Sequence, residues 1–122
     1  MQCTRKYPIL AGIARRESRL RYDSLTDFIE TARPVLARGP IAIVMVEDDV
    51  EVATTLRHHL QIGFRSVVAL MPAAFELPAD LRETTHRIDY DPTQPGAMED
   101  GVNTIAAAAR GQWIFYLSLI HI

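Results

Sequence analysis

The sequence predicts an α/β fold with an open parallel sheet, and three observations carry this prediction. First, the apolar run from Ile41 to Val46 follows the breaker pair Gly39-Pro40 and is typical of a strand covered on both faces. Second, another apolar run, residues 65–71, follows a helical pattern, so residues 41–71 form one βαβ unit with a right-handed crossover. Third, strand and helix patterns continue to alternate as far as residue 117.

Length and composition indicate one soluble domain. The chain has 122 residues, of which 48% are hydrophobic and 23% are charged, as is usual for a globular protein with a real core. A single cysteine, Cys3, excludes an internal disulfide and fits a reducing compartment, so we expect a cytoplasmic location. No apolar run approaches the roughly 20 residues of a membrane helix, and the N-terminus does not have the pattern of a signal peptide.

Charge is distributed unevenly along the chain. Residues 1–38 carry eight Lys/Arg and four acids, whereas residues 39–122 carry five Lys/Arg and eleven acids. We predict that residues 1–22, which lack a clean period, form a loosely attached basic leader. Such a charge excess is more often a solvated face than a nucleic-acid site, so we expect no nucleic-acid partner. Peripheral contact of the leader with a membrane stays open; an adaptor function of this kind would disappear when residues 1–22 are deleted.

A helix is expected to begin at Ser24. The stretch Ser24-Leu25-Thr26-Asp27 has the form of a capping box, with an acid at the third helical position. Apolar residues then recur at helical spacing, at Leu25, Phe28, Ile29, Ala32, Val35 and Leu36. Pro34 lies inside this pattern and should end or kink the helix.

The βαβ unit contains a second helix, predicted over residues 50–61 and ended by a glycine cap at Gly63. His58 and His59 are adjacent, so on a helix they point about 100° apart. We therefore expect no shared metal site: one histidine should be half-buried in the packing and the other solvated.

Three further elements follow the βαβ unit. A short helix is expected near residues 79–83, and residues 86–90 alternate polar and apolar side chains, which suits a strand with one wet face or at a sheet edge. After a proline- and glycine-containing loop at 91–96, residues 98–110 form an alanine-rich helix that ends at Gly111. Residues 112–117 give the second strongest strand pattern in the chain.

Three carboxylates, Glu47, Asp48 and Asp49, follow the first strand directly. The carboxyl ends of the strands are where open α/β sheets bind their ligands. An Asp can also cap the next helix, but one acid suffices for that, and Asp49 is the nearest to the helix. We therefore expect Glu47, with help from Asp48, to face a ligand.

These acids resemble the metal pocket of a response-regulator receiver domain. Val46-Glu47-Asp48-Asp49 is similar to the first strand and pocket of that family, and Asp91 lies about where the phospho-acceptor would be. The third strand of a receiver is central and needs an apolar run, whereas residues 86–90 would bury unpaired charges there. The receiver is therefore the alternative function, with Asp91 as the phospho-acceptor.

A second resemblance covers residues 41–117 and is to the nucleotide-binding half of family-2-like glycosyltransferases with the GT-A fold. The matching pieces, in the family's order, are Val46-Glu47-Asp48, His58-His59-Leu60-Gln61-Ile62-Gly63-Phe64, residues 67–70, and residues 106–117. The resemblance implies a Rossmann-like sheet with strand order 3-2-1-4, which leaves strand 86–90 at the edge. It further implies transfer of a sugar from a nucleotide-sugar donor, the base or ribose being held by Glu47 and Asp48.

The chain departs from that family at two places. Met71-Pro72 stands where the family has an Asp or Asn cluster, and no Asp-x-Asp metal motif follows residue 117. The resemblance therefore assigns no catalytic residue and no metal ligand here; Mn²⁺ or Mg²⁺ is expected only in a longer parent protein.

The C-terminal residues have a separate interpretation. Leu117-Ser118-Leu119-Ile120-His121-Ile122 matches the translation of a common transposon-derived sequencing adapter, so we expect residues 118–122 to be a non-native tail. The alternative is that residues 118–122 prolong the last strand. The chain then divides into a basic leader with an amphipathic helix (1–38), a partial nucleotide-sugar-binding domain (39–117) and this tail. Such a fragment should bind a nucleotide-sugar donor weakly and be inactive as a transferase.

Overall fold

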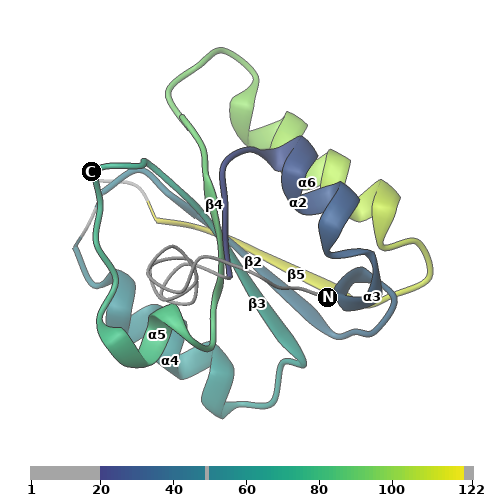
Figure 1. The fold of residues 1–122 in the computed structure, drawn as a ribbon, viewed down its shortest axis with the longest axis horizontal. Helices are drawn as coiled ribbons and strands as arrows, with labels where there is room; N and C mark the ends of the chain where they lie inside the picture. The colour runs from purple at the N-terminus through teal and green to yellow at the C-terminus, as the bar shows by residue number, and fades with distance from the viewer. Residues whose placement is uncertain (1–19, 49, 120–122) are drawn as a thin grey trace, which may run out of the picture.

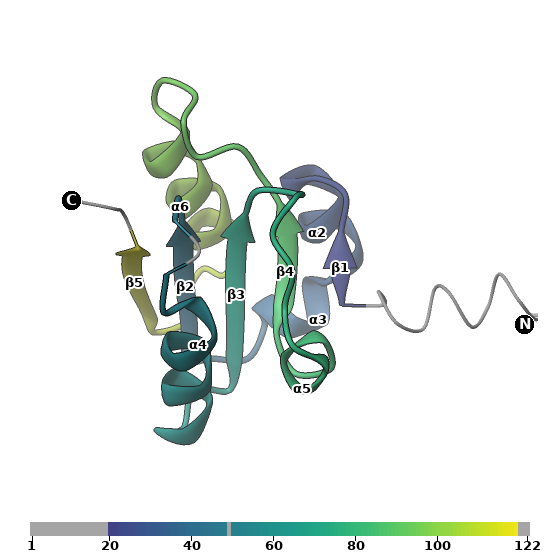
Figure 2. The same cartoon turned by 90° about the vertical axis from the view of Figure 1, so that its left-hand side faces the viewer.

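A five-stranded, all-parallel sheet with helices on both faces forms the molecule (Figures 1 and 2). The computed structural model describes residues 20–48 and 50–119. The sheet order is β1-β4-β3-β2-β5. The strands are β1 (Arg21–Tyr22), β2 (Ile41–Val46), β3 (Ser66–Met71), β4 (His86–Asp89) and β5 (Ile114–Leu119). The predicted α/β class with an open parallel sheet is confirmed.

Five helices in the described residues cover the two faces of the sheet. On one face lie α2 (Leu25–Thr31), α3 (Arg33–Leu36) and α6 (Ala97–Ala108), and on the other lie α4 (Val52–Gln61) and α5 (Ala79–Arg82) (Figure 1). No helix in the described part of the chain combines the length and the apolar character needed to cross a membrane.

The central strand β2 is buried along its whole length because both of its faces are covered. Its odd-numbered residues, such as Ile43, join the core beneath α2, α3 and α6, and its even-numbered residues, such as Val44, join the core beneath α4 and α5. This alternation follows from the pleat, which points successive side chains to opposite faces. A continuous apolar run is therefore what this position requires.

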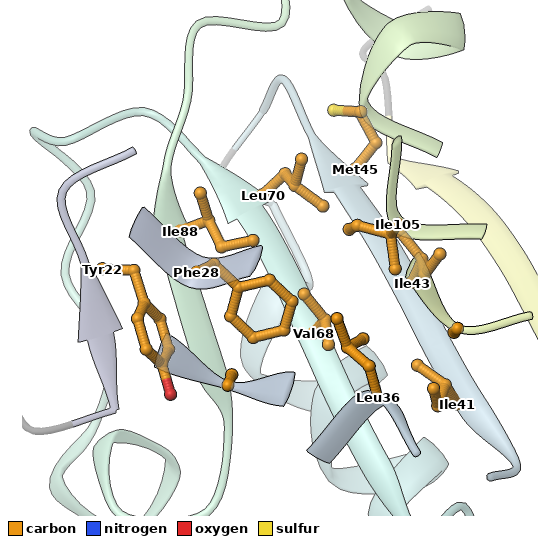
Figure 3. Close-up of a cluster of buried hydrophobic side chains, with 12 residues drawn as sticks. Tyr22, Phe28, Leu36, Ile41, Ile43, Met45, Val68, Leu70, Ile88 and Ile105 are labelled. Carbon is orange, nitrogen blue, oxygen red and sulfur yellow. The ribbon is translucent and has the colours of Figure 1, made fainter. Parts of the chain in front are cut away.

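Phe28 occupies the middle of the first core (Figure 3). Its ring meets Tyr22 edge to face, with 4.9 Å between ring centroids. Because Tyr22 comes from β1 and Phe28 from α2, this contact attaches the first described strand to the rest of the core.

The predicted helix signals are confirmed in this part of the chain. The Ser24 side chain accepts a hydrogen bond from the Asp27 N–H at 3.1 Å. The helix then breaks at Ala32, and Pro34 lies in the first turn of α3, where a missing N–H costs nothing. Gly63 follows α4 with φ +106, a left-handed conformation that glycine adopts without strain.

The prediction of a loose leader over residues 1–22 is wrong at its C-terminal end. Arg21 and Tyr22 form β1, which pairs in parallel with β4 through Arg21↔Arg87 and Tyr22↔Ile88. The pairing was missed because a two-residue strand has no periodicity to detect. Residues 1–19, with Cys3, lie outside the described residues.

The expected wet face or edge position of residues 86–90 is also wrong. β4 has neighbours on both sides, β1 and β3, and both Arg87 and Ile88 are buried on its opposite faces. A charged side chain normally indicates exposure, but the Arg87 guanidinium group is paired with Asp89 beneath the loop after β3.

The last strand begins and ends two residues later than predicted, at Ile114–Leu119. It pairs with β2 from Ile41↔Ile114 to Val46↔Leu119 and forms one edge of the sheet (Figure 2). Phe115 and Tyr116 remain 44% and 39% exposed. His121 and the other residues of 120–122 lie outside the described residues.

Candidate functional site

Glu47 and Asp48 lie at the carboxyl end of the central strand, as the sequence suggested. β2 ends at Val46, and the Glu47 N–H still donates to the Leu119 carbonyl of β5 at 2.9 Å. The chain runs from β2 outward to β3 and β4 on one side and later adds β5 on the other. The point between β2 and β5 is therefore where the strand order reverses, and this is the usual ligand position in such sheets.

The two carboxylates differ in their surroundings. Both side chains are half-buried. Asp48 Oδ1 accepts a hydrogen bond from the Val50 N–H at 2.9 Å, which orders the turn that leads into α4. Glu47 is thus the acid better suited to meet a ligand, while Asp48 supports the turn beside it.

Asp49, expected as the helix cap, lies outside the described residues. The structure places the N-cap of α4 further along, at Glu51, which has φ 60 and whose side chain makes no capping hydrogen bond. The N-cap residue of α4 is therefore Glu51, and its side chain does not cap the helix.

Sequence reasoning missed a charged cluster at the end of β4. Arg21 and Arg87 flank Asp89, with Arg21 Nε 3.0 Å and Arg87 Nε 3.3 Å from Asp89 Oδ1. Both guanidinium groups also donate to the Ala73 carbonyl, each at 3.1 Å. Burial, followed by the nearby Arg21 charge, lowers the pKa of Arg87 from its ordinary value, and Asp89 opposes that shift.

This cluster fills the carboxyl end of β3, where the resemblance would place acids that hold a nucleotide. The loop after Met71 offers its Pro72 and Ala73 carbonyls, and the arginines use them. The Arg87 Nε–H is buried without a hydrogen-bond acceptor in a suitable direction, so its contact with Asp89 is an ion pair only. The cluster therefore acts as a structural tie. The opposite charges of Arg21 and Asp89 are the only sequence feature that points to this cluster. They are far apart in the sequence, and only the pairing of β1 with β4 brings them together.

Asp91, the phospho-acceptor of the alternative interpretation, lies in an exposed turn. Its carboxylate accepts hydrogen bonds from the Thr93 N–H at 3.0 Å, the Thr93 hydroxyl at 2.6 Å and the Gln94 amide at 2.9 Å. The Thr93 hydroxyl, followed by the Gln94 amide, lowers the pKa of Asp91.

The sheet order keeps Asp91 away from the acids of β2. β3 lies between β2 and β4, so the strands that precede Glu47 and Asp91 are two positions apart, about 10 Å. In the receiver order the first and third strands are neighbours. Glu47 and Asp91 therefore follow strands that are not adjacent, unlike the acids of a receiver pocket.

The two histidines divide as expected. His59 is buried, with its Nδ1 atom 2.8 Å from the Thr55 carbonyl, and His58 is exposed. No group of three or more His, Cys, Asp or Glu side chains in residues 20–48 and 50–119 could hold a metal ion.

Two surface hollows lie apart from the acids. One of about 290 Å³ is lined by Met98, Glu99, Val102 and Asn103 of α6 and by Tyr116 of β5. The other, of about 360 Å³, is lined by Pro34, Val35, Arg38, Arg65 and Ser66. Neither hollow includes Glu47 or Asp48.

Comparisons with known proteins add no further constraint. No protein-family model, curated protein or solved structure gave a significant match to this chain.

Proposed function

We propose that residues 41–117 are the nucleotide-binding part of a nucleotide-sugar-dependent glycosyltransferase similar to family 2, with GT-A-type strand order. The observation that carries the proposal is the position of Glu47 at the end of β2, where the strand order reverses between β2 and β5. The pairing of β2 with both β3 and β5 supports it, because this sheet order differs from that of a receiver.

Glu47 would accept hydrogen bonds from the base or ribose of the donor, and Asp48 would hold the turn beside it. Charge-assisted bonds of this kind contribute roughly 1.5–3 kcal/mol each. A carboxylate suits this role because ribose hydroxyls and base N–H groups are donors. The same site would repel the diphosphate of the donor unless a cation neutralised it.

Sugar transfer itself would require further groups, to which the proposal assigns none of the described residues. A divalent ion would stabilise the departing diphosphate, and a base would take the proton of the acceptor hydroxyl. We therefore expect this chain to bind a nucleoside diphosphate weakly. The dissociation constant should be on the order of 1 mM, which corresponds to a binding free energy of about −4 kcal/mol. We expect no sugar transfer from this chain.

The test is a titration of uridine diphosphate followed by NMR. The wild-type chain should show shifts in residues at the carboxyl end of β2, and Glu47→Gln should weaken binding roughly tenfold, the effect of one charge-assisted bond. Glu83→Gln makes the same chemical change at an exposed residue before β4, at the opposite end of the sheet, and should bind as wild type does.

Two outcomes would contradict the proposal. One is the absence of ligand-dependent shifts near Glu47 in the wild-type chain at millimolar uridine diphosphate. The other is an equal change of binding in Glu47→Gln and Glu83→Gln, which would show that Glu47 has no specific role in the affinity.

A further inference from the structure

The two edges of the sheet are built differently. β1 is two residues long and its Arg21 is charged, and both features protect an edge strand from pairing with another chain. β5 is six residues long, and Ile114-Phe115-Tyr116-Leu117-Ser118-Leu119 contains no charge and no proline. One edge is therefore protected and the other is open, since no strand among the described residues pairs with the outer side of β5.

The backbone of β5 has a defined set of unpaired groups. The Trp113 and Leu119 carbonyls accept hydrogen bonds from Ile41 and Glu47, so the odd-numbered residues of β5 point their backbone groups at β2. Because these directions alternate along a strand, the N–H and C=O groups of Ile114, Tyr116 and Ser118 point outward. A bound partner must therefore be an extended strand that offers matching donors and acceptors.

The side chains along this edge are apolar and partly exposed. On the α4 face, Phe115 packs against His59 and Phe64, with 5.4 Å and 5.8 Å between ring centroids, yet it remains 44% exposed. On the α6 face, Tyr116 borders the hollow beside Met98 and Val102. A strand added to β5 would cover both flanks at once.

We propose that two copies of the chain pair through β5, antiparallel, about a two-fold axis at Tyr116. In this register Tyr116 lies opposite its equivalent and Ile114 lies opposite Ser118 of the other copy. All three are residues with outward-pointing backbone groups, so each pair exchanges two N–H···O bonds. The strand that the edge requires is thus supplied by a second β5, which carries no charge to oppose its equivalent.

The same asymmetry of the edges limits the assembly to a dimer. Pairing β5 with β5 is isologous and uses up the only open edge of each copy among the described strands. A filament would need β5 to pair with β1 of the next copy, and β1 is too short and too charged for that. This inference does not depend on the proposed nucleotide site, and it concerns the 122-residue chain, in which β5 includes residues 118 and 119 of the expected non-native tail.

Sedimentation velocity of the 122-residue chain, with Cys3→Ser to prevent disulfides through that residue, tests the proposal. We expect a monomer–dimer equilibrium with a dissociation constant on the order of 10–100 µM, because the interface is small. Tyr116→Lys, which opposes two charges at the axis, should weaken dimerisation at least tenfold. Ile62→Lys changes another exposed apolar residue, beyond the end of α4, and should dimerise as the parent does.

Disulfide formation tests the register and remains informative if a lysine variant fails to fold. Opposed residues of a hydrogen-bonded antiparallel pair have Cα atoms about 5.5 Å apart, within the roughly 4.4–6.8 Å that a disulfide spans. In the Cys3→Ser background, Tyr116→Cys should therefore give a covalent dimer on mild oxidation and Ile62→Cys should not. A chain that stays monomeric throughout the concentration range, or equal cross-linking of the two cysteine variants, would overturn the proposal.

Discussion

At the scale of single residues, His86 couples the stability of the fold to pH. It lies half-buried in β4, and its Nδ1 atom is 3.0 Å from the Tyr22 hydroxyl. Burial lowers the pKa of His86 from its ordinary value of 6.5. The unfolded chain therefore takes up this proton first as the pH falls. The contribution of His86 to stability is complete above pH 6.5 and decreases below it, until the pH passes the folded-state pKa.

His86→Gln should reduce this pH dependence. In urea unfolding between about pH 7.5 and pH 5.5, the variant should lose less stability than the wild-type chain. His58→Gln is the matched control, because His58 is exposed, and its pH profile should follow that of the wild type. Parallel profiles for His86→Gln and the wild type would contradict the role given to burial.

At the scale of an element, Gly101 determines how closely α6 approaches the sheet. A β-carbon at this position would lie 3.1 Å from Leu70 Cδ2 and 3.1 Å from Met45 Cε. Gly101→Val adds a branched side chain there and should destabilise the fold by about 2–3 kcal/mol through overpacking. This loss should outweigh the stability gained by replacing glycine, which is flexible in the unfolded chain. Ala107→Val on the exposed side of α6 should cost only about 0.5 kcal/mol from helix propensity. Chemical denaturation of both variants checks this, and equal losses would show that the helix has room to move away.

At the scale of the whole molecule, Asp89 ties the start of the described chain, in β1, to the neighbouring strand β4. Its ion pair with Arg21 joins residues 68 positions apart, and Arg87 is buried beside it. Asp89→Asn would leave Arg87 buried without its paired charge. We expect a loss of about 2–3 kcal/mol, below the roughly 3–5 kcal/mol typical of a fully buried pair, because Asp89 keeps 19% side-chain exposure.

Asp80→Asn is the control for this prediction. Asp80 also holds an arginine, with 2.9 Å between Arg57 Nε and Asp80 Oδ2, but both side chains are exposed. Urea unfolding should show little change for Asp80→Asn, since water screens such pairs. A similar small change for Asp89→Asn would mean that β1 is held by packing of Tyr22 and not by charge.

The sequence by itself determined the elements whose patterns are local. Six apolar residues in a row after Gly39-Pro40 indicate a strand with both faces covered, and β2 is one. The Ser24 cap, the break at Pro34 and the glycine end of α4 rest on backbone chemistry within a few residues, so they too were predictable. The position of Glu47 at the carboxyl end of β2 follows from the same local pattern.

Only the tertiary structure decided the environment of β1 and β4. The pattern of residues 86–90 predicted exposure, because charge and burial are normally opposed. Arg87 is buried nonetheless, since Asp89 and the carbonyls after β3 meet its guanidinium group, and Arg21 arrives from a segment that showed no period. Pairing between residues distant in sequence is set by how the sheet assembles, and the pattern within any one segment holds no information on it.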